Sequence, residues 1–204
     1  MASKYEVQLE IAGPAAMFTR PDSGAAFVSY PAPTYSASKG IFESVARLKS
    51  AYISPLRVEI CRQIQFQRYT TNYGGPLRHP SEAGGPNSFQ HHAVILADVC
   101  YRLYGVIEEA APSPTGLNHL HALQEMFNRR LANGQCYSMP CLGWREFVPT
   151  YVGPFRPETQ VNSSLDLEIP SMLHHVFDKP VAGKHAPEFR RNARVTRGVL
   201  SYAE

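Results

Sequence analysis

The stretch SYPAPTYSASKGIFESV, residues 29–45, opens with prolines and serines and continues as an amphipathic helix. Over residues 36–48 apolar side chains recur at helical spacing, while Lys39 and Arg47 share another face of the helix. Gly40 inside this helix costs about 1 kcal/mol relative to alanine, which predicts a close approach by another backbone or a ligand. The stretch therefore predicts the first helix of the fold.

Strand patterns precede and follow this helix. Apolar and polar residues alternate over residues 5–11, the period-two pattern of a half-buried strand. Alternation returns over residues 56–69, and residues 93–108 predict a buried strand, or two short strands broken near Asp98. Between them, residues 70–88 are rich in glycine, proline and serine, which predicts a long loop or hairpin tip.

A second helix and further strands complete the pattern. Residues 113–134 carry an apolar stripe at helical spacing and end at an Asn-Gly stop. Residues 135–153 predict strand, turn and strand, and residues 188–202 predict a last strand with a basic outer face. The resulting order is strand, helix, strand, strand, helix, strand. This order predicts a ferredoxin-like or RNA-recognition core of class α+β, with an antiparallel sheet and extra β-structure at the end.

Length and charge limit the classes of protein. A chain of 204 residues with 44% apolar residues fits a single domain, which we divide into a core of about 1–135 and a β-rich extension of about 136–204. The net charge of +3 means that any nucleic-acid contact requires local clusters of lysine and arginine. No apolar run approaches the roughly 20 residues of a membrane span, and the N-terminus does not resemble a signal peptide. We expect a cytoplasmic protein with no membrane partner.

The cysteines and histidines give no metal motif. Neighbouring residues on a regular element point to different sides, so neither His91–His92 nor His174–His175 is expected to share an ion. The cysteine spacing is wider than zinc sites use, which favours buried thiols. The sequence therefore predicts neither a metal nor a cofactor. The cysteines are Cys61, Cys100, Cys136 and Cys141.

Cations and hydroxyl groups gather around the start of the first helix. Helix N-termini bind anions through unpaired N–H groups and the helix dipole, so phosphate contacts are predicted here. The alternative is an ordinary helix cap with solvated charges. This set comprises Arg20, Tyr30, Thr34, Tyr35, Ser36, Lys39 and Arg47.

Two further clusters are basic, and the first of them also suits single-stranded RNA, because aromatic rings stack on bases and arginines neutralise phosphates. A solvated hairpin and a solvated edge strand are the respective alternatives. The first cluster comprises Arg62, Arg68, Tyr69, Tyr73 and Arg78 and continues to His91 and His92. The second comprises Arg190, Arg191, Arg194, Arg197 and Lys184, the last in a Lys184–His185 pair.

His119 and His121 open the second helix and could carry acid–base chemistry. Metal-free RNA cleavage needs a base for the 2′-hydroxyl and an acid for the leaving oxygen, and a histidine can act as either. Two residues apart on a helix, however, they do not face each other. Surface or capping histidines are the alternative interpretation.

Two blocks of sequence resemble the CRISPR-associated Cas family five, in the form found in type I-C systems, within the RAMP superfamily. They are FTRPDSGAAFVSYPAPTYSASKGIFESV, residues 18–45, and MFNRRLANGQCYSMPCLGWREF, residues 126–147, with a weaker match over residues 57–106. The resemblance implies a protein that holds the 5′ handle of CRISPR RNA in a Cascade surveillance complex. Its implied partners are Cas seven backbone subunits, the Cas eight large subunit and, through the complex, target DNA. The second block adds Arg129, Arg130 and Arg145 to the predicted RNA-binding residues.

The resemblance also implies metal-independent cleavage of precursor CRISPR RNA by a tyrosine, a lysine and a histidine. Ala46 stands at the tyrosine position. His119 or His121 stands for the histidine, and neither follows a lysine. RNA binding is therefore the expected function and cleavage the alternative, with Tyr35 or Lys39 assisting either histidine.

Overall fold

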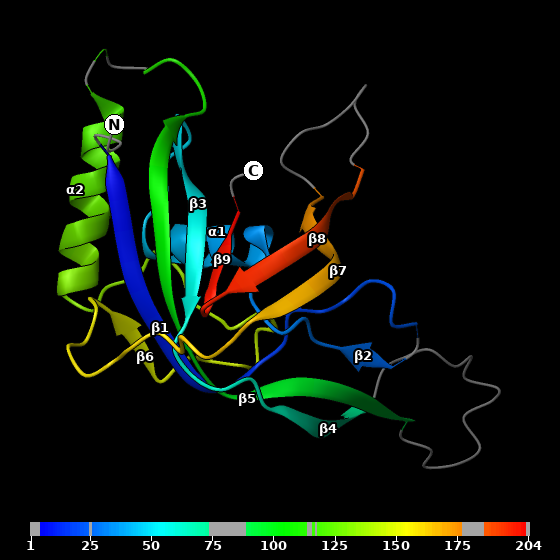
Figure 1. The fold of residues 1–204 in the computed structure, drawn as a ribbon. Helices are drawn as coiled ribbons and strands as arrows, with labels where there is room; N and C mark the ends of the chain where they lie inside the picture. The colour runs from blue at the N-terminus through cyan, green and yellow to red at the C-terminus, as the bar shows by residue number, and fades with distance from the viewer. Residues whose placement is uncertain are drawn as a thin grey trace.

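The computed structural model describes residues 5–24, 26–73, 89–113, 116, 118–176 and 186–202. Within them a single curled, mostly antiparallel sheet of nine strands is accompanied by two helices (Figure 1). This arrangement confirms the α+β class. The elements are β1 (Glu6–Ala16), β2 (Phe27–Val28), α1 (Tyr35–Val45), β3 (Ala51–Ile60), β4 (Phe66–Tyr73), β5 (Phe89–Glu109), α2 (His119–Ala132), β6 (Tyr151–Gly153), β7 (Leu167–His175), β8 (Glu188–Thr196) and β9 (Val199–Ser201).

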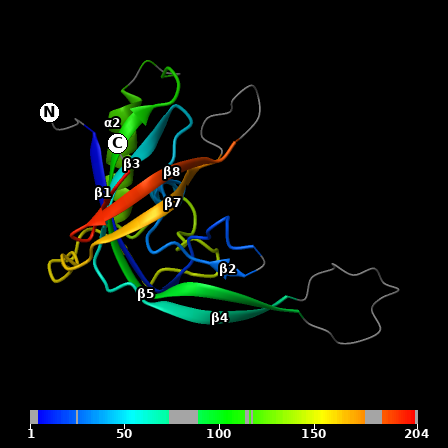
Figure 2. The ribbon, with the colours of Figure 1, turned by 45° about the vertical axis from the view of Figure 1, so that its right-hand side comes forward.

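The sheet is organised around the long strand β5. The strand order is β6-β1-β5-β3-β9-β8-β7, with β2 and β4 paired to β5 outside this path. One part of β5 pairs with β1 and β3, and its first residues pair with β4 in a ribbon that extends away from the rest of the molecule (Figure 2). Asp98 lies between the two parts with a positive φ of 47°. The predicted interruption near Asp98 is therefore a local irregularity within one strand.

The two helices contribute aromatic side chains to the apolar core. Phe42 of α1 and Phe127 of α2 are fully buried, and their ring centroids lie 5.9 Å apart. Burial of each such side chain contributes about 1.5–3 kcal/mol. The Thr34 side chain caps α1 by accepting a hydrogen bond from the Ala37 N–H at 3.1 Å. Neither helix, in the part of the chain described, is long and apolar enough to span a membrane.

Three predicted strand segments differ from the structure. The segment 56–69 belongs to two strands, β3 and β4, because the chain leaves the sheet between them. Residues 135–153 are irregular except for β6. The last predicted strand is a hairpin of β8 and β9, since Arg197 and Gly198 adopt positive φ angles of 49° and 79°. Two consecutive residues of this kind form the tight turn that matches the twist of paired strands.

A buried carboxylate fixes the edge of the sheet where β6 lies. Glu10 of β1 is fully buried and accepts hydrogen bonds from the backbone N–H and the guanidinium of Arg156, at 3.0 and 2.7 Å. Thr159 donates a further hydrogen bond at 2.7 Å. Burial alone would raise the pKa of Glu10, but these hydrogen bonds together hold the pKa below its usual value. The segment that follows β6 is thereby tied to β1.

Candidate functional site

Two hollows lie on either side of α1. The first, which we call the histidine cleft, has a volume of about 730 Å³. It lies between α1, β3, the end of β5 and the paired strands β7 and β8. Its lining comprises Tyr35, Lys39, Glu43, Arg47, Leu48, Lys49, Ala51, Tyr52, Ser54, Glu108, Glu109, Ala110, His174, His175 and Glu188.

The second hollow, which we call the Met139 groove, has a volume of about 580 Å³. It lies between another face of α1 and the irregular segment that precedes β6. Its lining comprises Ser36, Ala37, Gly40, Ile41, Ser44, Ser138, Met139, Cys141, Gly143 and Arg145.

The first turn of α1 positions one histidine of the cleft. The ring of Tyr35 stacks on His174, with centroids 4.2 Å apart and planes inclined by 15°. The Tyr35 hydroxyl forms a hydrogen bond with the Ser54 hydroxyl at 3.2 Å. Ser36 donates a hydrogen bond to the backbone carbonyl of His174 at 2.8 Å. The imidazole of His174 is thus held against α1 by both stacking and a backbone contact.

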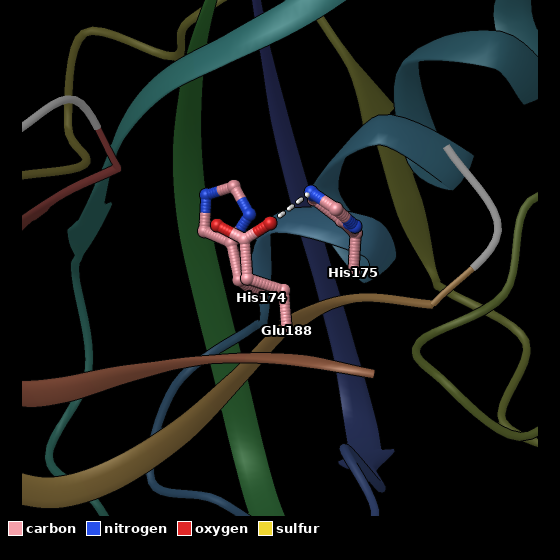
Figure 3. A group of neighbouring side chains, drawn as sticks. All are labelled: His174, His175 and Glu188. Atoms are coloured by element: carbon pink, nitrogen blue, oxygen red, sulfur yellow. Dashed lines mark ion pairs between the residues drawn. The ribbon is translucent and has the colours of Figure 1, made fainter. Parts of the chain in front are cut away.

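A β-bulge brings the second histidine to the same side. Leu173 pairs with Phe189 and His175 pairs with Glu188, so His174 is the extra residue between them. A bulge reorients side chains that a regular strand would send to opposite faces. The ring nitrogens of both histidines and a Glu188 oxygen consequently lie within 4.8 Å of one another (Figure 3). The prediction that this histidine pair points to different sides is wrong for that reason.

Glu188 links the cluster across the two strands. Its carboxylate forms an ion pair with Nε2 of His175 at 3.0 Å. The His175 side chain is only 7% exposed, whereas that of Glu188 is 63% exposed. The cluster therefore has one nearly buried imidazole and one solvent-facing carboxylate.

The balance of charge differs between the two hollows. Four carboxylates and three cations line the histidine cleft. One arginine and no carboxylate are among the residues that line the Met139 groove. The fixed charge thus favours a cation in the cleft and an anion in the groove.

Glycines shape the Met139 groove. A Cβ added at Gly40 would meet no described atom within 4 Å, so the helix presents an open surface there. The structure therefore shows no backbone close to Gly40 among the described residues, and the alternative of a ligand stays a prediction. Gly143 has φ of 90°, and a Cβ there would lie 1.8 Å from the carbonyl oxygen of Met17. Met139 between them is 73% exposed.

Several predicted RNA-binding residues serve the fold. Tyr30 is 2% exposed, and its hydroxyl accepts a hydrogen bond from the Leu173 N–H at 3.1 Å. Thr34 is buried as the cap of α1. These two side chains lie inside the protein, so a contact with RNA rests on the remaining members of the set.

Three of the predicted cations have partners within the chain. Arg20 pairs with Asp22 at 2.7 Å, and Arg62 pairs with Asp98 at 3.9 Å. Arg130 donates to the Val45 carbonyl at 3.1 Å, close to the end of α1.

Other members of the set face solvent or the hollows. Tyr69 packs on Phe147, with ring centroids 5.5 Å apart, and is partly exposed. Arg68, Arg129 and Arg145 are exposed, on β4, α2 and the Met139 groove respectively. Tyr35, Lys39 and Arg47 line the histidine cleft, and Ser36 lines the groove.

The histidines favoured from sequence lie apart from the cleft. His119 lies 4.0 Å from Glu109, and the exposed His121 uses its backbone N–H to complete the cap of α2. Neither is among the residues that line the histidine cleft. Ala46, which the resemblance sets at the tyrosine position, is 1% exposed. Arg78, Lys184, His185 and the Tyr73 side chain lie outside the part described.

Sequence reasoning missed the cluster of His174, His175 and Glu188. Its signal in the sequence is the His-His dipeptide alone, since the bulge depends on how β7 pairs with β8. The intervening residues 177–185 separate Glu188 from both histidines along the chain.

Most of the chain matches the model of a known protein family. The family model for Cas5d, described as "CRISPR-associated protein (Cas_Cas5)", matches residues 6–196. A protein of Thermus thermophilus named "CRISPR pre-crRNA endoribonuclease Cas5d" is 29% identical over 196 residues, covering 92% of this chain and 80% of the relative.

Solved structures share the fold. A structure titled "Crystal Structure of CRISPR-associated Protein" is 18% identical, with a TM-score of 0.72 over 99% of this chain and 93% of the other. A chain of a "CRISPR RNA-guided surveillance complex" is 17% identical, with a TM-score of 0.52 over 96% of this chain and 91% of the other.

Proposed function

The chain belongs to the Cas5d family of CRISPR-associated proteins, and on that premise we propose that it binds CRISPR RNA as a subunit of a type I-C surveillance complex. The observation that carries this proposal is the Met139 groove, which combines an exposed arginine with an apolar wall and has no carboxylate in its lining. Arginine binds phosphate through two parallel hydrogen bonds. An unpaired base would lie against the exposed Met139 while Arg145 binds the adjoining phosphate.

The finer features of the proposal concern the RNA and its assembly. We infer that the bound segment is the 5′ handle, and that Arg68 on β4 and Arg129 on α2 extend the contact beyond the groove. Cas seven and Cas eight subunits would be neighbours in a cytoplasmic complex that contacts target DNA. The antiparallel order β6-β1-β5-β3 with α1 and α2 supports a ferredoxin-like core within one RNA-binding domain.

Salt dependence tests the RNA-binding proposal. Labelled repeat RNA is titrated with protein in EDTA at several salt concentrations, with fluorescence anisotropy as the measurement. Affinity should survive EDTA and fall with salt, with a log–log slope of about −0.7 for each phosphate contacted in single-stranded RNA. RNA of equal length and scrambled sequence is the control. Absent or salt-insensitive binding would contradict the proposal.

A second candidate function is metal-independent cleavage of precursor CRISPR RNA. Two observations favour it: the name of the Thermus thermophilus relative, and the meeting of Tyr35, Lys39, His174 and His175 in one cleft. An imidazole would accept the proton of the 2′-hydroxyl as that oxygen bonds to phosphorus. The bond from phosphorus to the 5′-oxygen breaks, and a second group protonates that oxygen. The products are a 2′,3′-cyclic phosphate and a free 5′-hydroxyl.

Cleavage in EDTA tests this function and locates its site. Precursor repeat RNA is incubated with wild-type protein and with the variants His174→Ala, His119→Ala and His121→Ala. A reaction in the histidine cleft should lose about 10²–10⁴-fold in rate with His174→Ala and little with the other two. Loss with His121→Ala or His119→Ala alone would move the site to the start of α2. No product from the wild type would exclude the activity.

A further inference from the structure

We propose that His174, His175 and Glu188 bind one divalent transition-metal ion, of which Zn²⁺ is the best fit. Two imidazole nitrogens and one carboxylate oxygen, with water at the fourth position, form a donor set that Zn²⁺ uses widely. This site is separate from the proposed RNA-binding function. It also differs from the sequence prediction, which was that the chain binds no metal.

The distances between donor atoms suit an ion of this size. Bonds of about 2.0–2.1 Å in a tetrahedron place ligand atoms roughly 3.3 Å apart. His175 Nε2 and the Glu188 carboxylate are 3.0 Å apart, and all three donor atoms lie within 4.8 Å of one another. The Glu188 side chain is 63% exposed, so solvent can supply the water at the fourth position.

The surroundings hold the ligands in place before an ion arrives. His174 stacks on Tyr35 at 4.2 Å, and its backbone carbonyl accepts a hydrogen bond from Ser36 at 2.8 Å. The bulge fixes His175 on the same side of β7. Figure 3 shows the two imidazoles and the carboxylate directed toward one another. An arrangement that needs little reordering loses little conformational entropy on binding.

The electrostatic setting favours a cation. Among the described residues, the cleft lining has one more carboxylate than lysine and arginine side chains. Metal binding requires neutral imidazoles, and it adds positive charge where the carboxylates outnumber the cations.

Occupation by Zn²⁺ would also suppress cleavage. An imidazole bonded to a metal ion cannot exchange a proton with RNA at the same nitrogen. This consequence rests on the second candidate function, whereas metal binding itself does not. The ion would therefore act as an inhibitor of a reaction that proceeds in EDTA.

Equilibrium dialysis against Zn²⁺, with metal content measured by mass spectrometry, tests the site on the full chain. We expect one Zn²⁺ per chain. Loss of an outer-shell partner commonly costs about 10–100-fold in metal affinity, so Glu188→Gln and His174→Ala should cost no less. Glu188→Gln changes an exposed side chain, so it tests the site even if a histidine variant folds poorly. Binding that is unchanged in both variants, or absent from the wild type, would overturn the proposal.

Two controls separate this site from other metal ligands. His91 and His92 are also adjacent, but they pair in regular register with Thr71 and Thr70 of β4. The double variant His91→Ala/His92→Ala should keep its Zn²⁺. Cys136 is an exposed free thiol, so Cys136→Ser should also keep the ion. If either control loses the ion, the metal lies elsewhere and the assignment is wrong.

Discussion

The histidine cleft and the Met139 groove share one helix and differ in almost every other respect. Residues 35, 39, 43 and 47 face the cleft, and residues 36, 40 and 44 face the groove. Each series advances by four residues, so residues 35, 39 and 43 form one stripe along α1 and residues 36, 40 and 44 form another, while residue 47 lies just beyond the end of the helix. The cleft adds carboxylates and imidazoles from distant strands, whereas the groove adds Met139 and Arg145 from one irregular segment.

This difference shows how a single helix can serve two ligands of opposite charge. A shift of one residue along α1 moves a side chain from a cation-favouring hollow to an anion-favouring one. The helix therefore lines both hollows and separates one from the other.

The largest expected effect is on stability, from a substitution in the wall of the Met139 groove. Gly143→Ala should lower the free energy of unfolding by about 2–4 kcal/mol, because φ of 90° is strained for alanine and its Cβ would overlap the Met17 carbonyl. Urea denaturation measures this change. Gly40→Ala is the matched control, since a Cβ at Gly40 has no described neighbour within 4 Å. Equal stability of the wild type and Gly143→Ala would contradict the backbone described here.

An effect of intermediate size is expected on RNA affinity, which should distinguish the Met139 groove from the histidine cleft. Arg145→Ala should weaken RNA binding about fivefold at roughly 0.1 M salt, since one phosphate contact on a single strand contributes a slope of about −0.7. The salt slope itself should become shallower. Arg47→Ala, on the cleft side, should change affinity less because carboxylates outnumber cations in the lining of that cleft. If Arg47→Ala has the larger effect, the charge contrast does not decide where RNA binds.

The smallest effect concerns the open face of α1. Gly40→Ala should raise the free energy of unfolding by about 0.5–1 kcal/mol, because alanine is the better helix former and meets no clash. Thermal or urea denaturation measures the gain, and Zn²⁺ affinity should stay unchanged because the substitution faces the groove. A loss of stability would show that the groove is narrower than described.

The periodicity of apolar residues predicted those helices and strands whose pattern is local to their own sequence. α1 and α2 follow from apolar stripes, and β1 follows from alternation. The hairpin of β8 and β9 was missed because Arg197 occupies a turn position where asparagine is the usual signal. Tyr30 shows a further limit: a tyrosine beside prolines and serines suits either a surface contact or a core, and only packing decides between them.

The histidine cluster was beyond sequence reasoning for a different reason. Whether His174 and His175 share a face depends on the register between β7 and β8, and register is a property of two strands together. The residue types were visible in the sequence, but their relative orientation was not.

The bulge at His174 makes the metal site sensitive to chain length. Deleting one residue from this part of β7 would restore regular pairing with β8 and send one ligand to the opposite face. Such a deletion would change the composition very little. Among relatives, the site should therefore be traced by an extra residue in this strand rather than by a count of histidines. An insertion can thus create or remove a ligand site as effectively as a substitution.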